Sequence, residues 1–345
     1  MVSSVANNRE VQVGIVGLGQ LVREVHLPIL RQLRSARVVA IADPYPGAVE
    51  QCLPMTENAR AYSSLDALLE DDRVEAVLVA SPSGEHAQQA QRVLAAGKAL
   101  YLEKPIGSTA EEGRAVALAA RGAAAPAAMG FNYRFHPMIQ HARRALQEGK
   151  FTGVRRVRSC FSIAPRPLPA WKLKRSSGGG VLLDLASHHF DLLRYLLGAE
   201  ITAVSARIWN ERSEADCCEA ELSFENGVQA QCSFSFCRQE RDSLELIGAH
   251  GRMLIDRYAP LRYPVSPFSE FIRYQWERRR SPWKEVSYRR SLEAWTESIR
   301  GRRQPAVTLD DGLQALRIVL AAEQSALHNR RVRLEDVEAP VLSPV

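Results

Sequence analysis

Long hydrophobic runs are missing from this sequence, since no stretch reaches the about 18 apolar residues of a membrane helix. The N-terminal stretch MVSSVANNREVQVG also lacks the apolar core of a signal peptide. Both absences predict a cytoplasmic protein without a membrane partner. Low-complexity tracts and long repeats are absent too, and 46% hydrophobic with 24% charged residues is typical of a globular protein.

Cysteine is scarce, with six residues, and none forms a CxxC pair or has a histidine at metal-site spacing. Cys217 and Cys218 are adjacent, and adjacent residues of a strand point to opposite faces, so they make a poor chelate. We therefore expect reduced thiols, with neither a disulfide framework nor a metal site.

Clusters of basic and aromatic residues are also missing, although the net charge is +6. The basic residues are scattered through every segment, so a nucleic-acid partner is not expected. A small anionic substrate would suit this charge, or the charge has no functional meaning. The length of 345 residues exceeds one ordinary core and predicts two domains.

The stretch VQVGIVGLGQLVREVHLPIL predicts a strand, a glycine turn and a helix. Gly17 and Gly19 occupy the first two positions of a dinucleotide-binding fingerprint, followed by Gln20 and Leu21. Val22 stands at the third position, where glycine serves close helix packing rather than phosphate contact. The turn is therefore expected to bind a dinucleotide through its backbone.

A second predicted strand, RVVAIADP, ends at Asp43. An acidic residue about 20 positions after the glycine turn accepts hydrogen bonds from the ribose hydroxyls of an adenosine and repels a 2′-phosphate. This placement favours NAD over NADP. The alternative is an aspartate that only initiates the turn at Pro44.

Strands and helices continue to alternate through SSLDALLE, EAVLVASP, EHAQQAQRVLAAG and ALYLEKP, which predicts a parallel, doubly wound α/β sheet. Ligands of such sheets bind outside the carboxyl ends of the strands. The residues just past these ends are expected to line one crevice: Gly17, Gly19, Gln20, Leu21, Asp43, Ser81, Pro82, His86, Glu103 and Lys104.

Lys104 follows a buried strand and precedes Pro105, which places an ammonium at the cofactor edge of the sheet. Partial burial and the positive nicotinamide ring would both lower its pKa, towards a range useful for proton transfer or carbonyl polarisation. The alternative is a solvated lysine paired with Glu103.

The stretch GGGVLLDLASHHFD, residues 178–191, predicts a glycine-rich entry into a largely buried helix. The glycines would allow another molecule to approach closely. Asp184, His188 and Asp191 stand at i, i+4 and i+7, on one face of an α-helix. A carboxylate in this position can fix the tautomer of an acid/base imidazole, although a capping aspartate and a core histidine fit the pattern equally.

Together, LEKP at 102–105 and the glycine-rich stretch resemble the glucose-fructose oxidoreductase and inositol dehydrogenase family, Gfo/Idh/MocA. SPSGEHAQQA is similar to the family's loop near the nicotinamide ribose, GFNYRFHP to its crossing segment, and YRRSLEAWTESIRG to its late helix. The resemblance implies a Rossmann domain over 1–130 and an α+β domain over 131–345. It places substrate binding and assembly, as a homodimer or homotetramer, on an open and mainly antiparallel sheet of the second domain.

For activity, the resemblance implies a nicotinamide cofactor and hydride transfer between a ring carbinol and a ketone of a sugar or cyclitol. It assigns catalysis to Lys104, substrate binding to Asp184, and the general acid/base role to His188. Val22 and Ala186 depart from the family's glycines, but neither change removes a reactive group. The alternatives are a reductase of a non-sugar substrate, such as a cyclic imine, and a non-enzymatic NAD-binding regulator.

In the second half, VRRVRSCFSI predicts a strand, and four later segments predict a meander: ITAVSARIWN, CCEAELSFENG, VQAQCSFSFC and SLELIGAHGRMLID. The sheet is apolar enough that its outer face is expected to be covered by another subunit. Residues 260–285 show no period and are expected to form an irregular excursion. The loop APRPLPAWKLKRSS carries Arg166, Trp171, Lys172, Lys174 and Arg175.

This basic loop is expected to grip a phosphate, a carboxylate or a nucleotide diphosphate of the substrate, with Trp171 stacking on a ring. Tyr133 and Arg134 of the crossing segment would add a hydroxyl and a guanidinium. The alternative is a solvated charged face.

Overall fold

The computed structural model describes residues 9–249, 251–258, 268–301 and 303–338. Its contacts divide the chain into two units. The first contains Met1–Gly107, Glu111–His136 and Phe268–Gly312, and the second contains Ser108–Ala110, Pro137–Pro267 and Leu313–Val345. A boundary was expected after residue 130, but in the structure the first unit continues to residue 136. The first unit also includes the later segment 268–312.

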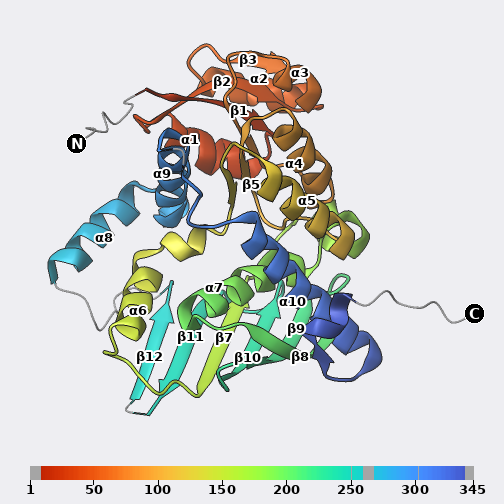
Figure 1. Ribbon diagram of the computed structural model, residues 1–345, viewed down its shortest axis with the longest axis vertical. Helices are drawn as coiled ribbons and strands as arrows, with labels where there is room; N and C mark the ends of the chain where they lie inside the picture. The colour runs from red at the N-terminus through yellow and green to blue at the C-terminus, as the bar shows by residue number, and fades with distance from the viewer. Residues whose placement is uncertain (1–8, 250, 259–267, 302, 339–345) are drawn as a thin grey trace, which may run out of the picture. The chain divides into compact units, whose positions relative to one another are not determined.

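The first unit is built on a six-stranded parallel sheet in the order β3-β2-β1-β4-β5-β6, the strand order of a Rossmann fold (Figure 1). The strands β4 and β5 are continuous apolar runs because both faces of a parallel sheet are buried. The strands are β1 (Val11–Val16), β2 (Ala36–Ala42), β3 (Arg60–Tyr62), β4 (Ala76–Val79), β5 (Ala99–Leu102) and β6 (Ala127–Met129).

Local sequence signals start some helices of this unit. Ser64 caps α3 by accepting a hydrogen bond from the backbone N–H of Ala67 at 3.2 Å. The main helices are η1 (Val22–His26), α1 (Leu27–Leu30), α2 (Pro46–Cys52), α3 (Leu65–Leu69), α4 (His86–Ala95), α5 (Ala110–Gly122), α8 (Phe268–Arg280) and α9 (Ser287–Arg300). Short 3₁₀ turns lie at η2 (Leu53–Met55), η3 (Ser83–Glu85), η4 (Asn132–Phe135) and η9 (Pro282–Lys284).

The prediction of an irregular excursion over 260–285 is wrong for part of that range. Residues 268–280 form the helix α8, while residues 259–267 lie outside the described residues. Arg290 of α9 pairs with Glu277 of α8 at 2.6 Å. Such tertiary contacts stabilise a helix whose sequence shows little apolar periodicity.

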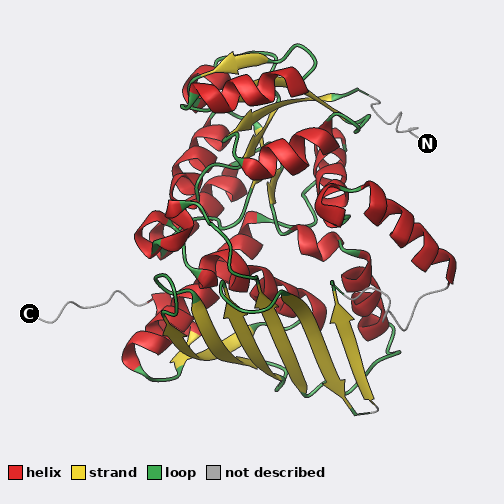
Figure 2. Cartoon of the chain, turned by 180° about the vertical axis from the view of Figure 1, so that it is seen from behind, coloured by secondary structure: helices red, strands yellow, loops and turns green. Residues whose placement is uncertain are grey.

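The second unit is built on a seven-stranded, mostly antiparallel sheet in the order β12-β11-β7-β10-β9-β8-β13 (Figure 2). The predicted meander holds for β8-β9-β10, but β7 lies between β10 and β11 and runs parallel to β10. The strands are β7 (Arg156–Ser162), β8 (Ile201–Trp209), β9 (Cys217–Phe224), β10 (Gln229–Ser235), β11 (Arg241–Gly248), β12 (Gly251–Asp256) and β13 (Val332–Arg333).

One face of this sheet packs against α7 (Ser187–Leu197), where the ring of Phe190 meets Phe234 of β10 edge-on at 5.5 Å. Gly198, with φ of 60°, ends α7 in the left-handed conformation. The other helical segments are α6 (Pro137–Gln147), η5 (Ala170–Leu173), η6 (Arg175–Ser177), η7 (Leu182–Ala186), α10 (Leu309–His328) and η10 (Leu334–Glu338).

The opposite face of the sheet is polar, contrary to the prediction of an apolar outer face. Alternate residues along its strands are exposed, and these include Arg156, Arg158, Glu219, Glu221 and Gln231. A subunit contact through this face stays a prediction, which sedimentation velocity tests. Such an interface would depend on ion pairs and hydrogen bonds more than on apolar burial. Among the described helices, none combines the length and the apolarity that a membrane crossing requires.

Candidate active site

The glycine turn after β1 packs directly onto the end of β4. Gly17 has φ of 84°, and a methyl group on its Cα would lie 2.5 Å from the backbone nitrogen of Ser81. Gly17 is therefore required by both conformation and space. At Gly19, by contrast, a methyl group would meet no protein atom within 4 Å. The turn is thus open on the side of Gly19, as a phosphate group approaching the backbone needs.

Asp43 fixes the same turn from the end of β2. Its Oδ2 accepts a hydrogen bond from the backbone N–H of Leu18 at 2.8 Å, and its Oδ1 accepts one from Tyr45 at 2.8 Å. The carboxylate therefore joins the glycine turn to the start of α2. Its bond to Tyr45 is also the contact expected of an aspartate that initiates the turn at Pro44. Gln20 is exposed and Leu21 half-buried beside it.

His86 connects the loop after β4 to the turn after β5. Its Nδ1 lies 2.7 Å from the carbonyl oxygen of Pro105 and its Nε2 lies 2.9 Å from that of Ser81, while Pro82 is exposed. Burial lowers the pKa of His86. The two carbonyl acceptors favour the charged ring and so raise this pKa, but their effect is smaller than that of burial. A neutral ring donates to one of these carbonyls at a time. His86 therefore holds the Lys104–Pro105 turn against the end of β4.

Glu103 and Lys104 follow β5. Glu103 is buried, and its Oε1 accepts a hydrogen bond from Nε2 of His26 at 2.9 Å. Lys104 is half-buried. Sequence reasoning missed His26, which is completely buried at the end of η1. The sequence did contain a signal for the contact between His26 and Glu103. His26 is a polar residue in the apolar helix after the glycine turn, and a buried imidazole needs a hydrogen-bond partner.

Tyr133 and Arg134 lie on η4, and both are buried. The Arg134 guanidinium pairs with Oδ1 of Asp311 at 2.8 Å. Asp311 in turn accepts hydrogen bonds from the backbone and hydroxyl of Thr308. The charge of Arg134 is therefore compensated within the first unit.

In the second unit, the three glycines before η7 allow the chain to pack on itself. Gly178 and Gly180 have φ of 78° and 93°, which glycine adopts readily. A methyl group on Gly179 would lie 2.4 Å from the carbonyl oxygen of Trp171 and 2.5 Å from that of Lys172. At Gly179 the close approach is made by the chain's own loop. The approach of another molecule to this stretch stays a prediction.

Replacing Gly179 with alanine is expected to destabilise the protein by about 1–3 kcal/mol, because the added methyl group overlaps two backbone carbonyls that cannot rotate away. The thermal midpoint should fall by about 2–4 °C per kcal/mol, as measured by circular dichroism. Gly122→Ala is the matched control, since a methyl group there meets nothing within 4 Å. Equal midpoints for the two variants would contradict the packing described.

The helix that follows begins with a π-helical turn, η7, and continues as α7. Asp184 lies on the π turn and is half-buried, whereas His188 and Asp191 lie on α7 and are buried. The expected single α-helical face is thus altered at its start, because a π turn has more residues per turn. The ring of His189 contacts the sheet instead. Its Nδ1 lies 2.7 Å from Ser159 Oγ of β7, and its Nε2 lies 3.1 Å from Asp242 Oδ1 of β11.

Lys172 is the cationic partner of Asp184. Its Nζ lies 3.1 and 2.9 Å from the two carboxylate oxygens, and it also lies over the ring of Trp171 at 5.5 Å. Arg175 pairs with Glu323 at 2.5 Å, and Arg166 lies 4.0 Å from a carboxylate oxygen of Glu240. Lys172 and Arg175 are therefore paired inside the second unit, whereas Arg166 makes only an exposed, long contact and Lys174 is exposed.

Comparison with known proteins covers both units. Residues 11–131 match the oxidoreductase family with an NAD-binding Rossmann fold, and residues 139–254 match the GFO/IDH/MocA C-terminal domain. An inositol 2-dehydrogenase of Rhizobium meliloti (strain 1021) is 28% identical over 94% of this chain and 99% of its own length. A myo-inositol 2-dehydrogenase of Thermotoga maritima is 26% identical over 94% and 99%.

Among solved structures, a probable dehydrogenase from Thermotoga maritima superimposes with a TM-score of 0.81, at 25% identity over 95% of this chain and 100% of that chain. The two family matches follow each other along the chain as the two sheets do. The chain therefore belongs to the Gfo/Idh/MocA oxidoreductase family, and its first domain is an NAD-binding Rossmann domain.

Proposed function

We propose that this protein transfers a hydride between NAD and a ring carbinol or ketone of a cyclitol or sugar. Two features carry the proposal: Asp184 of η7 pairs with Lys172 of η5, and His188 follows Asp184 by four positions on the continuing helix α7. A carboxylate fixed by an ammonium can accept hydrogen bonds from vicinal hydroxyl groups, and an imidazole nearby can exchange the proton of a carbinol. The relatives named as inositol dehydrogenases support this substrate class.

The residues of the first unit fit the cofactor. Gly19 leaves open space over the turn, and Asp43 sets a carboxylate beside it that suits a ribose diol and repels a 2′-phosphate. Gly17, Gly19 and Asp43 would therefore hold NAD at its pyrophosphate and adenosine ribose. When bound, the oxidised nicotinamide supplies a hydride acceptor.

Each catalytic residue has a separate role in this proposal. His188 takes the hydroxyl proton while the carbinol carbon loses its hydride, and it returns the proton in the direction of reduction. Asp184, held by Lys172, orients the neighbouring hydroxyl groups. Lys104 stabilises the negative charge that develops on the substrate oxygen.

A neutral substrate is better supported than an anionic one. Lys172 and Arg175 each pair with a partly buried carboxylate of the same unit, so less of their charge is left to bind a phosphate. The alternative is an anionic sugar, which would be bound by the exposed Lys174 after a rearrangement of the loop. The loop's charge alone therefore does not select a phosphorylated or nucleotide-linked sugar.

The test is turnover by the purified protein over a panel of neutral cyclitols, free sugars, sugar phosphates and nucleotide sugars, with NAD and NADP in parallel. We expect reduction of NAD with a neutral cyclitol or sugar, followed by absorbance. Turnover confined to phosphorylated or nucleotide sugars would select the anionic alternative. NADH binding with no turnover on any compound would overturn the proposal in favour of a regulator or a non-sugar reductase.

A further inference from the structure

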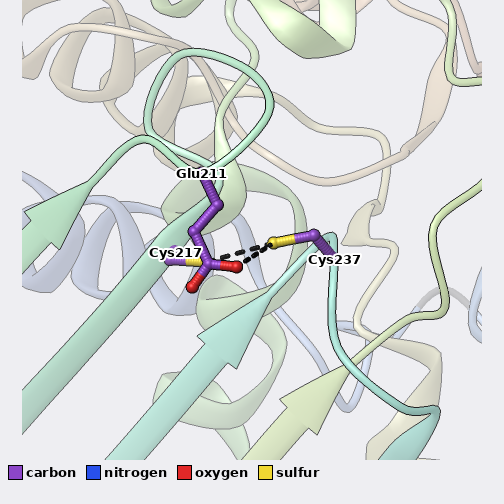
Figure 3. A group of neighbouring side chains, drawn as sticks. All are labelled: Glu211, Cys217 and Cys237. Atoms are coloured by element: carbon purple, nitrogen blue, oxygen red, sulfur yellow. Dashed lines mark hydrogen bonds between the residues drawn. The ribbon is translucent and has the colours of Figure 1, made fainter.

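Two thiols and a carboxylate meet at one end of the second sheet, and none of them belongs to the residues assigned to catalysis. Figure 3 shows Glu211, Cys217 and Cys237 with their polar atoms converging. The sulfur atoms of Cys217 and Cys237 are 3.4 Å apart, and Sγ of Cys237 donates to Oε2 of Glu211 at 3.2 Å. Ser235 Oγ lies 3.2 and 3.3 Å from the two sulfurs.

The antiparallel pairing of β9 and β10 brings the thiols together. Cys217 at the start of β9 is opposite Ser235, and Cys237 follows Ser235 by two positions. The two cysteines share one side of the hairpin because the side-chain period of a strand is two residues. The contact between Cys217 and Cys237 could not be predicted from their spacing in the sequence, because two strands and the turn between them separate the two residues.

Glu211 is held in place by the loop between β8 and β9. The buried carboxylate of Asp216 accepts backbone hydrogen bonds from Glu211 at 2.8 Å, Arg212 at 2.7 Å and Ser213 at 2.8 Å. Oε1 of Glu211 accepts from Trp209 Nε1 at 3.2 Å and from the Arg238 guanidinium. Its second oxygen, Oε2, is thereby turned towards the sulfurs, in the way that outer hydrogen bonds orient a metal ligand.

We propose that Cys217, Cys237 and Glu211 bind one Zn²⁺ ion per chain. Tetrahedral zinc with bonds of about 2.3 Å to sulfur and about 2.1 Å to oxygen places two sulfurs about 3.8 Å apart and sulfur and oxygen about 3.6 Å apart. The observed separations of 3.4 and 3.2 Å need to open by only a few tenths of an ångström. The fourth position is taken by water or by the Ser235 hydroxyl.

Two sulfurs and one carboxylate oxygen form a donor set that suits Zn²⁺. The S–H of Cys237 already points to the carboxylate of Glu211. Zn²⁺ binds thiolates and displaces both thiol protons to solvent, and its affinity should therefore fall as the pH is lowered.

The site has a structural consequence for the helix that carries Asp184. The carbonyl oxygen of Ala215, in the loop that holds Glu211, accepts a hydrogen bond from the N–H of Val181 at 3.0 Å. Val181 directly precedes η7. A bound ion would therefore stiffen the loop that fixes the start of this helix.

The experiment is titration of the full-length, reduced and metal-free protein with Zn²⁺ in competition with a chromophoric chelator, and with Co²⁺ as a spectroscopic probe of thiolate ligation. We expect one ion per chain with a dissociation constant of about 1 μM or tighter. Cys237→Ser and Glu211→Gln should each weaken binding by about 10- to 100-fold or more. Zn²⁺ should raise the thermal midpoint of the unsubstituted protein and not that of Cys237→Ser.

Cys160→Ser is the matched control, because Cys160 is a half-buried cysteine of β7 in the same sheet and is not a member of the cluster. Its zinc affinity should equal that of the unsubstituted protein. Glu211 is exposed, so Glu211→Gln is expected to keep the fold, which circular dichroism verifies. Equal affinities of Cys237→Ser and Cys160→Ser would overturn the proposal. A Cys217–Cys237 disulfide found by peptide mapping, with no zinc uptake after its reduction, would also overturn it.

Discussion

Replacing His188 with glutamine is expected to lower kcat by about 10²- to 10⁴-fold, the usual contribution of a positioned acid/base group. Glutamine is similar in reach and forms hydrogen bonds, but it cannot take up the carbinol proton at neutral pH. NADH affinity should stay within a few-fold, because the residues that would hold the cofactor belong to the first unit. Steady-state kinetics and NADH fluorescence titration measure the two effects separately.

His189→Gln is the control for this variant. The His189 ring is buried and bonded to Ser159 and Asp242 of the sheet, so its loss should lower the thermal midpoint more than kcat. The pH profile of kcat should change for His188→Gln and stay the same for His189→Gln. Equal losses of kcat in both variants, or full activity of His188→Gln, would remove His188 from its assigned role.

The first unit was predictable because its signals are local. The Gly17 turn needs a residue that tolerates φ of 84°, and the apolar runs of β1, β4 and β5 are each bounded by a turn or a helix cap. Alternation of strand and helix then leaves few topologies for a parallel sheet. The placement of Asp43, Ser81 and Glu103 at strand ends followed from the same pattern.

The features that the sequence concealed are set by contacts between distant segments. The sequence pattern of β7 does not predict that this strand lies between β10 and β11, because tertiary packing determines which strands pair. The π turn at Leu182–Ala186 has the same residue types as an α-helix. The pairs Lys172–Asp184 and His26–Glu103 likewise join residues that only the fold brings together. Charges counted along the basic loop therefore do not show which of them are paired within the fold.

Replacing Lys104 with methionine is expected to lower kcat by about 10²- to 10³-fold, the effect of removing one preorganised group that stabilises an oxyanion. The lysine follows Glu103, which is bonded to His26 at 2.9 Å, and precedes Pro105, whose carbonyl lies 2.7 Å from His86. These contacts fix the backbone on both sides of Lys104. The position of the Lys104 backbone is thus set before the reaction, and a large electrostatic effect requires the same of its ammonium. Steady-state kinetics measures the loss.

Two further variants separate charge from structure at this turn. Lys104→Arg keeps a cation and should retain more activity than Lys104→Met if the charge stabilises the substrate oxygen. Lys98→Met is the matched control, since the Lys98 ammonium donates to the carbonyl of Val74 at 2.7 Å in the same unit and has no assigned catalytic role. Because Lys104 acts on charge that develops in the transition state, kcat and kcat/KM should fall together for Lys104→Met. A rise in KM at unchanged kcat would instead assign Lys104 to binding of the ground state.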